Sequence, residues 1–139
     1  MGRVEFDPPT MMATAEAHVE TGWRIVSLIT WVSVLAALIA TAISSRTIGQ
    51  PVWWLGTRFN PAHPAAMLVP LAMVVVPMVT AWRAPQMMVR VNLACSLLLM
   101  ATVVPDIGDS PAVSLAVVVI ASAAFLAAIA QLIGSRKYR

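Results

Sequence analysis

This chain of 139 residues carries little charge and almost no cysteine. Charged residues make up 11% of it, against about a quarter of an ordinary soluble domain. Hydrophobic residues make up 60%, and the mean hydropathy is +0.84. These values exclude a water-soluble globular enzyme and a disordered chain, and they leave an integral membrane protein. The single cysteine, Cys95, excludes an intrachain disulfide and a C-x-x-C metal or redox pair.

The few charges are mostly basic and give a net charge of +3. Because the bases flank apolar segments, they indicate membrane orientation and contact with anionic headgroups rather than nucleic-acid binding. Arginine outnumbers lysine eight to one, and alanine and valine are abundant. This usage is typical of GC-rich bacterial genomes, as in actinobacteria. We therefore expect a multi-pass protein of the bacterial cytoplasmic (inner) membrane.

Four apolar runs are long enough to cross a bilayer, which needs about 20 helical residues. They cover residues 23–44, 65–82, 87–104 and 111–133. Short connections at 83–86 and 105–110 favour antiparallel neighbours, so the predicted fold is an all-α, up-down four-helix transmembrane bundle over residues 23–133. A cytoplasmic segment, 1–22, precedes it and a basic cytoplasmic tail, 134–139, follows it.

The helix ends carry recognisable signals. Thr10 is expected to cap a short amphipathic helix over 11–21, ahead of the first span. His63-Pro64 and Ser110-Pro111 predict helix starts, and Gly134 predicts the end of the last helix. The N-terminal segment is long and holds four acidic residues, so we expect no cleaved signal peptide.

Basic residues next to the spans predict the orientation. Arg46 and Arg58 lie on one side of the membrane in the four-span arrangement. Six bases lie on the other side: Arg3, Arg24, Arg83, Arg136, Lys137 and Arg139. Both termini are therefore expected in the cytoplasm, as an even number of spans requires.

Polar residues are scarce inside the spans, and such residues usually indicate function. Arg90 and Asn92 in the third span and Gln131 in the fourth lie at a similar depth near the cytoplasmic end. They are candidate contacts to a partner or a lipid, and we predict an Arg90–Gln131 hydrogen bond. Snorkelling of Arg90 to the interface is the simpler alternative.

Pro70 and Pro77 lie seven residues apart in the second span and so share a helix face. Each removes a backbone donor and can kink the helix. The kink predicts either static packing or, in a transporter, a polar-lined cavity beside both prolines.

Small residues recur at helical spacing, which lets helix backbones approach closely. The predicted packing face comprises Ser33, Ala37 and Thr41 in the first span and Ala123 and Ala127 in the fourth. Packing within the bundle is one interpretation. A surplus of such faces favours contact with another subunit.

The loop between the first and second spans, residues 45–64, is expected on the outer side of the membrane, and we call it the outer loop. It places Trp53 and Trp54 between Gly49 and Gly56. Paired tryptophans suit anchoring at the membrane interface, or a docking patch for a partner. Arg58 in the same loop is a candidate contact that could pair with Asp106 or Asp109.

No residue set favours catalysis, a cofactor or a metal. His63 and Met67 are spaced for copper, but the methionines are scattered and one histidine is not a cluster. No acid–base pair shares a depth in the membrane. We expect no enzyme activity.

The leading hypothesis is therefore a non-catalytic accessory or structural subunit of a larger bacterial membrane complex, such as a respiratory, envelope lipid-transport or secretion assembly. Its expected partners are other membrane-protein subunits and membrane lipids, through the small-residue faces and the tryptophan-rich loop. The alternative is a small homo-oligomeric transporter or lipid-binding protein that uses the proline-kinked second helix.

Overall fold

The computed structural model describes residues 8–57 and 59–137, and side chains within 21–57 and 59–134. The described chain is helical, without a strand. Its α-helices are α1 (Pro8–Thr47), α2 (Pro64–Arg83), α3 (Met88–Ala101) and α4 (Pro111–Lys137). The short 3-10 turns η1 (Pro85–Met87) and η2 (Val104–Asp106) flank α3.

Within the described residues, four helical segments are long and apolar enough to cross a membrane, as the hydropathy predicted. They are Thr21–Thr47, Pro64–Arg83, Pro85–Asp106 and Pro111–Gly134. Many large apolar side chains on these segments are exposed, among them Ile29, Leu68, Leu98 and Leu126. Outward-facing aliphatic residues suit a lipid environment, so the chain has the helices of a multi-pass membrane protein.

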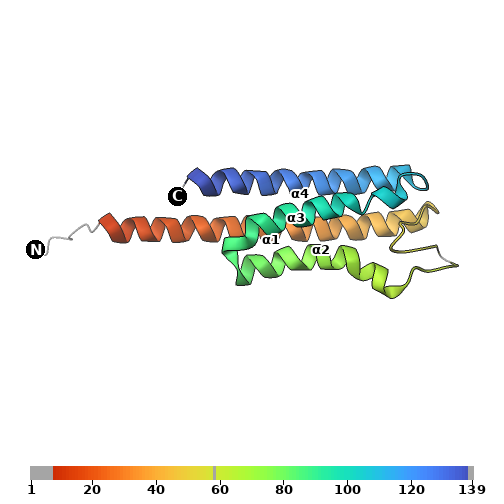
Figure 1. Cartoon of the computed structure of the whole chain (residues 1–139), viewed down its shortest axis with the longest axis horizontal. Coiled ribbons are helices and arrows are strands. Elements are labelled where there is room, and N and C mark those ends of the chain that lie inside the picture. The colour runs from red at the N-terminus through yellow and green to blue at the C-terminus, as the bar shows by residue number, and fades with distance from the viewer. Residues whose placement is uncertain (1–7, 58, 138–139) are drawn as a thin grey trace, which may run out of the picture.

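The helices lie side by side along the long axis of the molecule, and successive helices run in opposite directions in the view of Figure 1. The most extensive packing is between neighbours, since α1 and α3 both contact α2 and α4. The main core contains Trp31, Val74, Leu99 and Ala121, one residue from each helix. The amino-terminal part of α1 extends beyond the other three helices (Figure 1).

The prediction of a separate short helix before the first span is wrong. One helix of 40 residues, α1, starts at Pro8 and continues through Thr10 and Gly22 to Thr47. Proline is favourable at a first helical position. A single internal glycine costs only about 1 kcal/mol, which does not break a long helix.

The start of α2 is confirmed. The helix begins at Pro64, and the Nδ1 atom of His63 accepts a hydrogen bond from the Ala65 backbone N–H at 3.2 Å. Pro70 and Pro77 are both buried on one face. The predicted shared face of the prolines is therefore present.

The prediction that Gly134 ends the last helix is wrong, because α4 continues to Lys137. A side chain at Gly134 would overlap the ring of Trp23 in α1. Glycine here allows a close approach between α1 and α4 rather than a helix stop.

The outer loop folds back onto the end of the bundle. Val52 and Leu55 are buried and pack with Val113 of α4. Gly49 and Gly56 both have positive φ, at 73° and 69°. At Gly56, a Cβ would also overlap backbone atoms of residues 60–62, while at Gly49 it would meet nothing within 4 Å.

These two glycines form a matched pair. Gly49→Ala should cost about 1–2 kcal/mol from left-handed backbone strain alone. Gly56→Ala should cost clearly more, since the overlap adds to the same strain. Thermal unfolding in mild detergent measures both. Equal losses would contradict the close approach at Gly56.

Candidate functional site

Three helices meet at a cluster of buried polar side chains, Ser27, Trp31, Asn92 and Gln131. Trp31 Nε1 donates to Asn92 Oδ1 at 3.0 Å. Asn92 Nδ2 donates to Ser27 Oγ at 2.9 Å and to Gln131 Oε1 at 2.8 Å. All four side chains are at most 2% exposed. We call this set the polar cluster.

The polar cluster follows from helix geometry. Ser27 and Trp31 are four residues apart and so share a face of α1. An amide nitrogen has two protons, and both protons of Asn92 find an acceptor. Each such bond between membrane helices contributes about 0.6 kcal/mol, up to about 1.7. The cluster therefore joins α1, α3 and α4 and fixes their rotation about their own axes.

The predicted Arg90–Gln131 hydrogen bond is wrong. Arg90 is exposed, and Gln131 accepts from Asn92 instead. Residues two positions apart on an α-helix are rotated by about 200° around its axis. Arg90 and Asn92 therefore point to opposite sides of α3. Ser27 and Trp31 were missed in the sequence. The available signal was a tryptophan well inside a span, whose indole N–H needs a partner when buried.

The two loop tryptophans are both half-buried, but Trp53 bonds to α3 and η2 whereas Trp54 lines a cavity beside α1. The Trp53 backbone N–H donates to Asp106 Oδ1 at 3.0 Å, and its Nε1 donates to the Thr102 carbonyl at 2.8 Å. Trp53 therefore ties the loop to the end of α3 and to η2, where Asp106 is buried. The predicted pairing of Arg58 lies outside the described residues.

None of the predicted packing residues is fully buried. Ser33 and Ala123 are exposed, and Ala37, Thr41 and Ala127 are half-buried. The inward small residues of α4 are instead Ala121, Ala124 and Ala128. The hydroxyls of Ser33 and Thr41 donate to carbonyls four residues earlier in α1, at 2.9 and 2.8 Å. These hydroxyls are therefore satisfied within their own helix.

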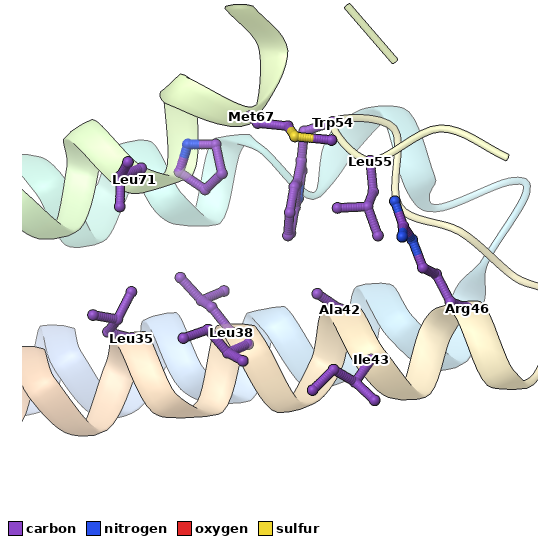
Figure 2. A pocket seen from close by; sticks show the side chains of 11 residues that line it. Leu35, Leu38, Ala42, Ile43, Arg46, Trp54, Leu55, Met67 and Leu71 are labelled. Carbon is purple, nitrogen blue, oxygen red and sulfur yellow. The ribbon is translucent and has the colours of Figure 1, made fainter. Parts of the chain in front are cut away.

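A cavity of about 450 Å³ opens between α1, the start of α2 and the outer loop. Pro70 lines it but Pro77 does not, and apart from Arg46 its walls are apolar. The prediction of a polar-lined cavity beside both prolines is thus wrong in its lining. Figure 2 shows Trp54 and Leu55 reaching from the loop toward α1, with Arg46 at the outer end. We call this cavity the outer groove.

Within the described part of the chain, no group of three or more His, Cys, Asp or Glu side chains comes together to hold a metal. Cys95 is buried in the main core. His63 is placed at the start of α2 and its Nδ1 is engaged there. The polar cluster and the outer groove are therefore the two candidate sites.

The polar cluster yields a direct test. Asn92→Leu keeps a similar volume but leaves Trp31, Ser27 and Gln131 without their central partner. We expect a loss of about 1–3 kcal/mol in stability, despite the gain in apolar character. Thermal unfolding in mild detergent measures it. Ser96→Ala is the control, because the buried Ser96 hydroxyl donates to Leu93 of its own helix. An Asn92→Leu variant as stable as Ser96→Ala would refute this role.

Comparison with known proteins gives no family for the chain: no protein-family model, curated protein or solved structure matches it.

Proposed function

We propose that this protein is a non-catalytic accessory subunit of a larger bacterial inner-membrane complex. The observation that carries the proposal is the outward position of small residues on α1. Ser33, Ala36, Ala40 and Ser44 are all exposed. We call these four residues the small face of α1.

Small side chains are unusual at positions that only contact lipid. On α1 the other exposed apolar positions hold bulky aliphatic residues, such as Ile25, Ile29 and Ile39. Exposed alanines also occur on other helices, for example Ala72 and Ala123, but the four small residues on α1 share one face. Association of helices in a bilayer depends on close packing, which small residues permit. A helix of another subunit is the partner that this face suits.

The polar cluster supports a structural role as well. Intramembrane polar groups usually line a substrate path or a proton relay. Here the Asn92 amide protons are both bound to side chains of neighbouring helices. The cluster holds helices together, so the bundle acts as a rigid scaffold in this proposal.

The outer loop provides a second contact in this proposal. Trp53 and Trp54 are half-buried, while Phe59 is 98% exposed. The tryptophans position the loop, and Phe59 presents an apolar ring to a partner or to the interface. Aromatic side chains are enriched at such contacts.

The proposal includes an up-down antiparallel bundle with both termini in the cytoplasm. Arg83 at the end of α2 then lies on the cytoplasmic side, and Arg46 at the end of α1 lies outside. The excess of bases near the termini and Arg83 supports this orientation.

Cysteine labelling in intact cells tests the orientation. Cys95→Ala removes the native thiol. Asp109→Cys, on the α3–α4 connection, should then react with a membrane-impermeant maleimide, because Asp109 is exposed and lies on the outer side in the proposed orientation. Gln86→Cys, exposed in the turn between α2 and α3, should react only after the cells are opened. The reverse pattern would invert the orientation.

Purification of the chromosomally tagged protein in mild detergent, with mass spectrometry of co-purifying proteins, tests the accessory role. Stoichiometric membrane subunits are expected. Ala40→Leu should lower their yield about tenfold, since a bulky side chain prevents the close approach. Val75→Leu, at an exposed position on α2, should leave the yield unchanged.

A homogeneous homo-oligomer without partners would contradict the accessory role. It would favour the second candidate, a small homo-oligomeric transporter or lipid-binding protein. The outer groove beside Pro70 is the observation that favours that candidate.

A further inference from the structure

The outer groove combines an apolar trough with one positively charged side chain, Arg46, at its end. Leu35 and Leu38 of α1 and Leu71 of α2 line its deep part, and Trp54 and Leu55 cover it from the loop. Arg46 lies in the last turn of α1, is exposed, and lines the same groove at its outer end (Figure 2).

From this arrangement we propose that the outer groove binds one anionic phospholipid, with an acyl chain in the trough and its phosphate on Arg46. The inference is independent of the accessory role, because the groove and the small face lie on different flanks of α1.

The dimensions of the groove fit one leaflet. Eleven residues separate Leu35 from Arg46, which at about 1.5 Å per residue gives about 16 Å along α1. Half of a hydrocarbon core of about 30 Å is about 15 Å. A chain that starts at Arg46 would therefore reach Leu35 near the bilayer midplane.

The walls explain why the space stays open. On the α1 side, Ala42 contributes only a methyl group. On the α2 side, the rigid ring of Pro70 is buried against the bundle. Ala42 and Trp54 also pack against the cluster of Val52, Leu55 and Val113, which holds the covering loop in place. The trough is thus formed by the fold itself.

The charge selects the kind of lipid. Among the described residues, no carboxylate forms an ion pair with Arg46, so its guanidinium can bind an external anion. A guanidinium binds phosphate oxygens through two parallel hydrogen bonds. In a zwitterionic headgroup, the positive charge next to the phosphate repels the guanidinium and weakens this attraction. An anionic glycerophospholipid satisfies both the guanidinium and the apolar trough.

Native mass spectrometry of the full chain tests the site. The protein in mild detergent is titrated with phosphatidylglycerol or with phosphatidylcholine of the same acyl chains. One phosphatidylglycerol should remain bound, with an affinity about tenfold above that of phosphatidylcholine. Arg46→Gln should remove this preference, and Ala42→Leu should lower the affinity for both lipids by filling the trough.

Arg83→Gln is the matched control, because it removes an exposed arginine in the last turn of a helix, as Arg46 is, but outside the groove. It should leave the bound phosphatidylglycerol unchanged. An equal loss in Arg83→Gln and Arg46→Gln would show general charge attraction and overturn the proposal. So would equal retention of the two lipids, or a second copy or another protein bound in place of lipid. Because the readout is bound lipid, failure here leaves the co-purification test of the accessory role unaffected.

Discussion

A polar side chain buried between membrane helices has no water to bond, so it must find its partner in the protein. Asn92 meets this requirement by bonding to side chains of α1 and α4 at once. The three helices therefore have one relative rotation in which all these bonds form. α2 contributes no side chain to this cluster and packs instead through Pro70, Val74, Pro77 and Ala81. The outer groove opens along that α1–α2 side.

The outer end of the bundle obeys the same requirement. Trp53 uses its backbone and its indole N–H to bond to Asp106 and to the Thr102 carbonyl. These bonds hold the loop on α3 and η2, and chain continuity then directs the next residue, Trp54, into the groove (Figure 2). The hydrogen bonds of Trp53 thus position the side chain of Trp54 over the groove.

Hydropathy and capping signals predict the number of spans and the start of α2, because both depend on local sequence alone. The sequence also places Arg90, Asn92 and Gln131 at one depth. It does not predict which side of α3 faces inward, and that rotation decides between Arg90 and Asn92 as the partner of Gln131. The sequence does not predict the role of Gly134 for a related reason. Its close contact is with Trp23, which is far away in the sequence. The outer groove depends on three segments and has no local signature.

The inward face of α1, with Ser27, Trp31, Val34 and Leu38, belongs to the core of the bundle. Successive residues on a helix are rotated by about 100°, so Ile39, which lines the groove, and Ala40, on the small face, project from different flanks. One helix can then contact a partner subunit and a lipid at the same time without competition between them. A lipid held between α1 and α2 would leave the small face clear, and its phosphate would neutralise Arg46 at the outer surface. In the proposed arrangement the periphery of α1 makes both contacts, and the polar cluster holds this helix in a fixed orientation.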